Sequence, residues 1–85
     1  MSTTPQSRVT ALVTGLLDAK GQGSPIGADE RLVDAGLTSM DMVNLMLAVE
    51  AEFDIMIPPG DITPANFRSV ASIEALVGRV GRAAA

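Results

Sequence analysis

Apolar residues recur every three or four positions in three separate stretches of this 85-residue sequence. This spacing places the apolar side chains on one face of an α-helix, so each stretch predicts an amphipathic helix. A chain of this length can hold one shared core, which predicts a single domain over residues 1–85 whose ends, 1–3 and 81–85, fray. The predicted long helices cover about 4–20, 38–53 and 69–80.

Capping signals predict where the first and last long helices start, and they predict a fourth, short helix. Thr4 can cap the first helix, and Pro5 suits the first helical position because its missing N–H is not needed there. Thr63 followed by a proline repeats this signal and predicts a short helix at 65–67. Ser69 can cap the last helix. The fold class is therefore an all-α bundle of three main helices and one short helix.

A long connection separates the first two long helices and runs from about Gly21 to Leu37. Loops of this length are uncommon in compact domains. The connection covers the length of a helix before the next helix begins, which predicts a crossover in place of a tight hairpin. Four of its apolar residues can dock on the bundle, namely Ile26, Leu32, Val33 and Leu37.

Ser39 stands at the start of the middle helix. Thr38 and Asp41 fit the capping signature of a Ser or Thr followed three residues later by an acid, with Leu37 and Met42 placed to form a hydrophobic staple. A serine at a helix start ordinarily serves as the cap, but here Thr38 takes that role and leaves the Ser39 hydroxyl facing solvent. The unpaired N–H groups and the helix dipole favour an anion there by about 0.3–1 kcal/mol, so the hydroxyl is well placed to bear a phosphodiester.

The middle helix has more apolar surface than one core face needs. One stripe is of the usual core kind: Met42, Leu45, Met46, Val49 and Phe53. A second stripe begins beside Ser39 and consists of Met40, Val43 and Leu47, flanked by Asp41, Asn44 and Glu50. Two interpretations stay open: a helix buried between neighbours on two sides, or an exposed docking strip with the acidic rim that transient interfaces use.

The residue types that the chain lacks restrict its chemistry. There is no Cys and no His, which excludes disulfides, the usual zinc sites, Cys–His pairs and Ser–His triads. With no organised carboxylate pair either, a small enzyme has little support, and neither catalytic residues nor metal ligands are expected. Any thiol would have to come from an attached group.

Charge and hydropathy add expectations about partners. The formal net charge is −4, and residues 32–67 contain acids but no base. Such a segment repels nucleic acid and attracts basic protein surfaces, although the acids could also do no more than solvate a surface. The first residues are polar, and no apolar run is long enough to span a membrane, which predicts a cytoplasmic protein, taken here as a monomer.

One segment resembles a known family. Acyl carrier proteins have a phosphopantetheine attachment site that commonly reads Leu-x-Glu/Asp-Leu-Gly-x-Asp-Ser-Leu, and it resembles Leu32-Val33-Asp34-Ala35-Gly36-Leu37-Thr38-Ser39-Met40. The resemblance continues through Val43, Leu45, Ala48, Glu50, Glu52-Phe53-Asp54-Ile55 and Ile57-Pro58. A lone Gly-x-x-Ser would be a weak signal, but the alternation of acidic and apolar residues agrees over some two dozen positions. The first and last helices agree in placement and pattern only.

The resemblance implies a non-catalytic carrier. A phosphopantetheinyl transferase would use coenzyme A to attach 4′-phosphopantetheine to Ser39, and the thiol of that arm would hold cargo as a thioester. The further partners implied are a cargo-loading ligase or acyltransferase and a downstream transferase or synthase. A cleft between the middle helix and the short helix can shelter cargo. The middle helix would be the partner-binding surface, with candidate residues Thr38, Met40, Asp41, Val43, Asn44, Leu47 and Glu50.

Some departures from the family pattern change the charge of this segment. Thr38 keeps the cap but lacks the charge of the usual Asp, while Asn44, Ala51 and Met56 stand where carriers of fatty acid synthesis usually have Glu. The middle helix is thus less acidic and more apolar. We therefore expect a specialised carrier outside core fatty acid synthesis, with dedicated partners whose docking patches are less basic.

The cargo stays open between an acyl chain, a polyketide unit and an amino acid activated by a stand-alone ligase. Leu32-Val33 lacks the aromatic pair that commonly precedes this motif in peptide-synthetase carriers, which argues against that subgroup. The alternative function is a carrier-like interaction module that is never modified.

Overall fold

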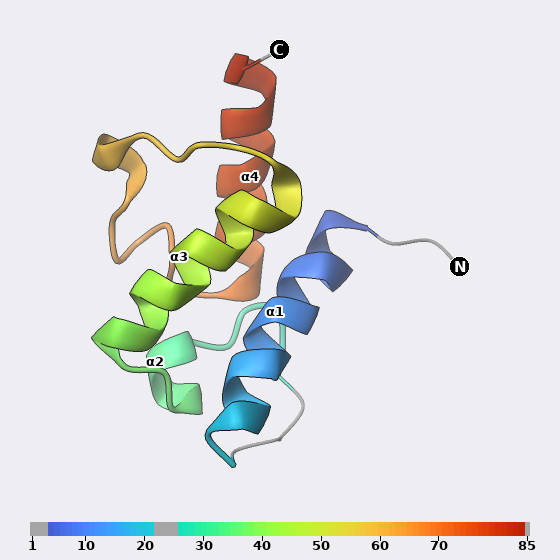
Figure 1. The fold of residues 1–85 in the computed structure, drawn as a ribbon. Helices are drawn as coiled ribbons and strands as arrows, with labels where there is room; N and C mark the ends of the chain where they lie inside the picture. Colours follow the sequence, from blue (N-terminus) through green and yellow to red (C-terminus); the bar gives the residue numbers. More distant parts are fainter. Residues whose placement is uncertain (1–3, 22–25, 85) are drawn as a thin grey trace.

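The computed structural model describes residues 4–21 and 26–84, and all regular structure in these ranges is helical. The long helices are α1 (Pro5–Ala19), α3 (Ser39–Phe53) and α4 (Val70–Ala84). The short ones are α2 (Leu32–Ala35) and the 3-10 helix η1 (Pro59–Asp61). Helix α1 packs against both α3 and α4, and α2 lies beside the start of α3 (Figure 1). The predicted all-α bundle with a long crossover is confirmed.

The core is almost entirely aliphatic and draws on all three long helices. Its fully buried side chains include Val9, Val13, Leu45, Val49, Val70, Ile73 and Leu76. Burying a side chain of this size contributes roughly 1.5–3 kcal/mol, so these contacts supply the main force that holds the helices together. Leu45 and Val49 belong to the core stripe predicted for the middle helix, and Met42, Met46 and Phe53 of that stripe pack partly buried against it.

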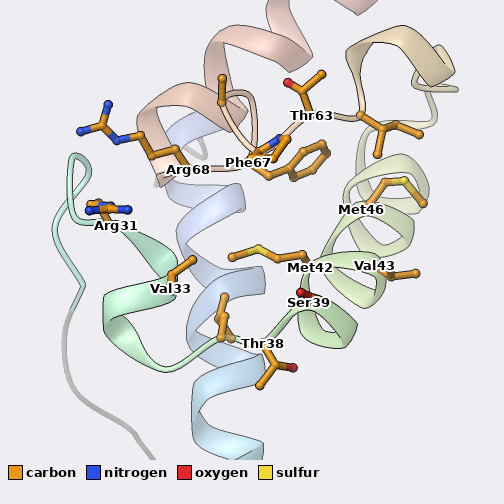
Figure 2. Close-up of a pocket in the computed structure, with 14 residues that line it drawn as sticks. Arg31, Val33, Thr38, Ser39, Met42, Val43, Met46, Thr63, Phe67 and Arg68 are labelled. Atoms are coloured by element: carbon orange, nitrogen blue, oxygen red, sulfur yellow. The ribbon is translucent and has the colours of Figure 1, made fainter.

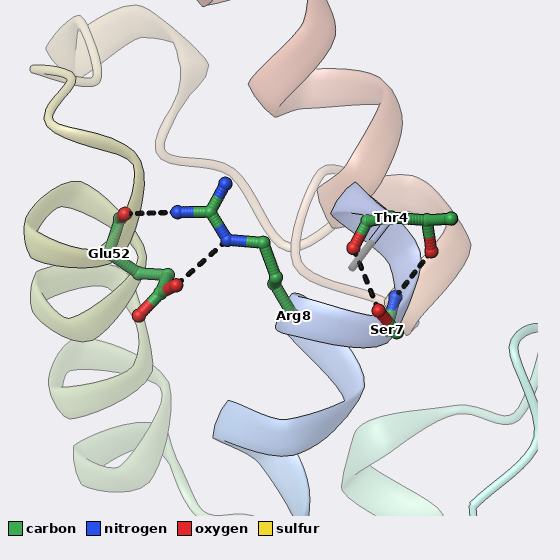
Figure 3. Close-up of polar contacts among 4 residues, drawn as sticks. All are labelled: Thr4, Ser7, Arg8 and Glu52. Carbon is green, nitrogen blue, oxygen red and sulfur yellow. Dashed lines mark hydrogen bonds and ion pairs between the residues drawn. The ribbon is translucent and has the colours of Figure 1, made fainter. Parts of the chain in front are cut away.

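The predicted starts of the three long helices are confirmed. Thr4 caps α1: its hydroxyl accepts a hydrogen bond from the Ser7 N–H at 3.1 Å, and its carbonyl accepts one from the Ser7 hydroxyl at 2.9 Å (Figure 3). Ser69 precedes α4, which is helical as far as Ala84 and so extends into the predicted frayed tail. The fraying itself stays a prediction, and residues 1–3 lie outside the described residues.

The crossover contains the short helix α2, which the sequence did not predict. Residues 22–25 of the crossover lie outside the residues that the structure describes. Two backbone hydrogen bonds tie it to the start of α4: Leu32 N donates to Arg68 O at 2.8 Å, and Ala71 N donates to Ala28 O at 2.9 Å. Leu32 is fully buried as expected, but the prediction that Val33 docks on the bundle is wrong, because this residue is 62% exposed. Successive residues of an α-helix point about 100° apart, so a single turn that buries Leu32 turns Val33 outward.

The prediction of a short helix at 65–67 is also wrong. Thr63 does act as a cap, since its hydroxyl accepts from Asn66 N at 3.2 Å and its carbonyl accepts from Phe67 N at 3.2 Å. The result is one turn that does not propagate, because Phe67 is buried in the core and the capping residue of α4 follows two positions later. The short helix of this connection is η1 instead.

Candidate functional site

The start of α3 is built as a capping box. The Thr38 hydroxyl accepts a hydrogen bond from Asp41 N at 3.2 Å, and Asp41 Oδ2 accepts one from Thr38 N at 2.8 Å. Thr38 is therefore the N-cap and Ser39 the first helical residue, as predicted. Because the Thr38 hydroxyl already accepts from the Asp41 N–H, the Ser39 side chain has no capping role.

The Ser39 side chain is exposed, and no described residue is a hydrogen-bond partner of its hydroxyl. Within the described contacts, the N–H groups of Ser39 and Met40 also have no acceptor, as expected for the first two positions of a helix. These groups favour a phosphodiester on this hydroxyl, because exposed N–H donors and the positive end of the dipole stabilise an anion. The site thus fits a phosphate-linked prosthetic group.

A groove of about 750 Å³ opens beside Ser39. One wall is formed by Met42, Val43 and Met46 of α3, and the facing wall by the segment 62–68 with Phe67. Figure 2 shows Ser39 at the α3 side of this groove, and Arg31 and Arg68 across it. A cleft is present where one is expected between the middle helix and a short helix at 65–67, although these residues form a turn and not a helix. Its apolar walls can take up an apolar group.

The second stripe of α3 is exposed. Met40, Val43 and Leu47 are 71%, 49% and 54% exposed, and we call these three residues the α3 strip. The interpretation of a helix buried between neighbours on two sides is therefore wrong. The strip begins next to Ser39, and Asn44 is exposed beside it. An apolar patch at this position is suited to contact with another protein.

Asp41 also has a contact outside the capping box that the sequence did not predict. Its Oδ2 lies 2.5 Å from Lys20 Nζ, at the end of α1. The Lys20 ammonium, followed by the Thr38 N–H and the Thr38 hydroxyl, lowers the pKa of Asp41 to about 2. Glu50, the other predicted acid of the rim, accepts a hydrogen bond from Ile57 N at 2.8 Å and so fixes the exit from α3. Both carboxylates therefore bind groups within the chain and help to hold the two ends of α3 in place.

Several groove residues were missing from the predicted site. Met42 and Met46 are predicted only as part of the core stripe, and Phe67 only as part of the short helix at 65–67. Phe67 lies in the core, Met42 and Met46 pack against it, and all three also line the groove. Val33, expected in the core, lines the groove as well. No sequence signal separates a core methionine from one at the edge of a cleft, since both lie on the same helical stripe.

Every helix in the described ranges is too short or too polar to cross a bilayer.

An exposed serine without a structural task, beside an apolar groove in a small helical bundle, defines a protein able to carry a covalently attached group. The sequence model of the family described as "Phosphopantetheine attachment site" matches residues 7–78. The chain therefore belongs to the family of phosphopantetheine-binding carrier domains, and it is a carrier protein.

Two relatives come from Bradyrhizobium diazoefficiens. Aminoacyl carrier protein 1 is 50% identical over 76 residues, which cover 89% of this chain and 84% of that protein. Aminoacyl carrier protein 2 is 47% identical over 72 residues, which cover 85% and 81%. These relatives confirm the expectation of a specialised carrier outside core fatty acid synthesis.

A solved structure is similar as well. It is the crystal structure of Bradyrhizobium japonicum glycine:carrier protein ligase complexed with glycylated carrier protein, in which one chain matches with a TM-score of 0.74 and 49% identity. The match covers 86% of this chain and 99% of that chain. The fold of the carrier family is thus reproduced here over most of the sequence.

Proposed function

We propose that this chain carries an aminoacyl group, with glycine the first candidate, on a 4′-phosphopantetheine arm attached to Ser39. The observation that carries the proposal is the Ser39 hydroxyl, which is exposed at the first position of α3 and has no partner among the described residues. It lies inside the segment that matches the attachment-site family. The relatives named aminoacyl carrier proteins support the choice of cargo.

Attachment requires a phosphopantetheinyl transferase and coenzyme A. Ser39 Oγ forms the new bond to phosphorus while the pyrophosphate bond of coenzyme A breaks, and the hydroxyl proton and adenosine bisphosphate leave. The N–H groups of Ser39 and Met40, which have no acceptor among the described contacts, would be available to stabilise the charge of that phosphate. The capping box holds this turn in place without using the reacting hydroxyl.

When attached, the arm supplies the thiol that this cysteine-free chain lacks, and that thiol holds the cargo as a thioester. The chain itself contributes no catalytic group in this proposal. Its groove offers an apolar surface beside the attachment point, and the α3 strip offers the contact for partner enzymes. The other residues predicted to bind partners are Thr38, Asn44, Asp41 and Glu50. The carboxylates of Asp41 and Glu50 already have partners within the chain, so Thr38 and Asn44 are the more accessible of the four.

The loading enzyme in this proposal is a stand-alone ligase that activates an amino acid. The ligase in the similar crystal structure is a glycine:carrier protein ligase complexed with glycylated carrier protein, which makes this class of enzyme the first to test. A downstream transferase would then accept the aminoacyl group. The cytoplasmic location and the monomeric state expected from the sequence stay predictions.

The test has two stages and uses intact-protein mass spectrometry. Incubation with coenzyme A and a promiscuous phosphopantetheinyl transferase should add the mass of one arm to the wild type and nothing to Ser39→Ala. The modified protein, given ATP, glycine and a glycine:carrier protein ligase, should then gain one glycyl group, which the unmodified protein should not. Failure of the first stage with every transferase would support the unmodified interaction module; failure of the second alone would remove glycine as cargo.

A further inference from the structure

Lys20 pairs with Asp41, the acid nearest to the attachment point in the sequence. Lys20 is the C-cap of α1, and its ammonium reaches across to Asp41 in the first turn of α3. The oxygen that it contacts also accepts the N–H and the hydroxyl of Thr38. The side chains of Lys20 and Asp41 are only 29% and 16% exposed. A protein that approaches Ser39 therefore meets a satisfied ion pair in place of an unpaired carboxylate.

The other two acids of α3 are also engaged within the chain. Glu52 Oε2 lies 2.8 Å from Arg8 Nε, and the Arg8 guanidinium also donates to the Glu52 carbonyl at 2.6 Å (Figure 3). The same guanidinium lies over the Phe53 ring, 4.3 Å from its centroid. Glu50 accepts from Ile57 N. Helix α1 thus supplies a cation to each end of α3.

We propose that Lys20 determines which partners this carrier accepts: by pairing with Asp41 it makes the start of α3 neutral, so that α3 is recognised through its apolar strip by enzymes with an uncharged, apolar docking surface. The inference rests on the proposed function, because it concerns the proteins that act at the attachment site. Enzymes that dock through basic residues are disfavoured. Lys20 is a positioning residue for specificity and takes no part in chemistry.

Electrostatic steering explains why a single ion pair can change which partners bind. An unpaired carboxylate attracts a basic surface over about one Debye length, which is roughly 8 Å at physiological ionic strength. A close pair cancels most of this field, so steering is lost. A partner arginine could contact Asp41 only by displacing Lys20, which exchanges one ion pair for another without a net gain. The α3 strip, in contrast, binds by removing apolar surface from water, which depends little on salt.

The experiment measures the dissociation constant of the unmodified protein for a phosphopantetheinyl transferase with a basic docking face, without coenzyme A. Lys20→Met keeps the apolar stem and removes the charge. We expect this variant to bind about fivefold more tightly than the wild type at about 0.02 M salt, with the difference gone at about 0.5 M. Lys20→Arg should behave as the wild type, because it restores the pair. Circular dichroism confirms that each variant is folded.

Two further variants separate Lys20 from net charge. Lys20→Met combined with Asp41→Asn should lose the gain in affinity, since the exposed carboxylate is gone. Arg79→Met removes one positive charge from α4, where Arg79 donates to Asn66 Oδ1, and should show no gain. The inference is overturned if Lys20→Met binds as the wild type does at every salt concentration, or if Arg79→Met gains as much. Adding coenzyme A to the same mixtures tests the proposed function separately: attachment of the arm with no Lys20 effect would overturn this inference alone.

Discussion

Two serines stand at the starts of long helices, Ser39 at α3 and Ser69 at α4, and their environments are opposite. Ser69 is 6% exposed and is the cap of its helix: its hydroxyl accepts from Ser72 N at 3.2 Å, and its N–H donates to the Ser72 hydroxyl at 3.0 Å. Ser39 is exposed and lies one position inside its helix, because Thr38 is the cap. A shift of one residue in the capping register decides whether a serine hydroxyl is structural or available for modification.

The largest difference between the two sites should appear in stability. Ser69→Ala leaves Ser72 N without its acceptor in a largely buried turn and should lower the free energy of unfolding by about 1–2 kcal/mol. Ser39→Ala removes a hydroxyl that has no described partner and should change it by less than about 0.5 kcal/mol. Urea unfolding of both variants measures the two values. Equal losses would show that Ser39 has a structural role after all.

The next effect concerns Thr38, which caps α3 in place of Ser39. Thr38→Ala should lower the free energy of unfolding by about 1 kcal/mol, because Asp41 N loses its acceptor. Thr38→Ser is the matched control and should be close to the wild type. A negligible loss in Thr38→Ala would mean that Ser39 can take over the cap, and arm attachment should then slow in that variant.

The helix starts could be predicted from sequence because their determinants are local. The capping box spans only Thr38 to Asp41, and a proline after a Thr marks α1 without reference to the rest of the fold. The contact between Lys20 and Asp41 joins residues 21 positions apart, so it depends on the path of the crossover. The orientation of Val33 likewise depends on how α2 meets the core, and no local pattern encodes it.

The influence of tertiary structure also explains why the short helix predicted at residues 65–67 does not form. The Thr-Pro signal was interpreted correctly as a cap, since Thr63 does accept from Asn66 N. What ended the helix after one turn was tertiary structure: Phe67 enters the core and α4 begins in its own direction. Propensity decides whether a turn can start, whereas packing decides whether it continues.

A smaller effect tests whether the start of α3 favours an anion. Ser39→Asp places a carboxylate at the first helical position and should raise the free energy of unfolding by about 0.3–1 kcal/mol at low salt. Ser39→Asn is the neutral control with a similar shape. The gain should fall as salt is added, because the site is exposed. Destabilisation by Ser39→Asp, relative to Ser39→Asn, would contradict a site suited to a phosphodiester.

The last comparison separates the starts of α3 and α4 by the pH dependence of their stability. The folded-state pKa of Asp41 is about 2, below its ordinary value of 3.8, so its contribution to stability is present above about pH 4 and is lost as the pH falls towards 2. The first turn of α4 contains no acid, so the cost of Ser69→Ala should be independent of pH over this range. Acid titrations of the wild type and Asp41→Asn, followed by circular dichroism, measure the difference. A wild-type curve that matches Asp41→Asn would contradict the ion pair with Lys20.

The central claim is that Ser39, and no other serine, is the attachment point. The most direct measurement is fragment mass spectrometry after incubation with coenzyme A and a phosphopantetheinyl transferase, carried out on the wild type, Ser39→Ala and Ser69→Ala. We predict one arm on the fragment that contains Ser39 in the wild type and in Ser69→Ala, and none in Ser39→Ala. An arm on Ser39→Ala, or on any fragment without Ser39, would contradict the account.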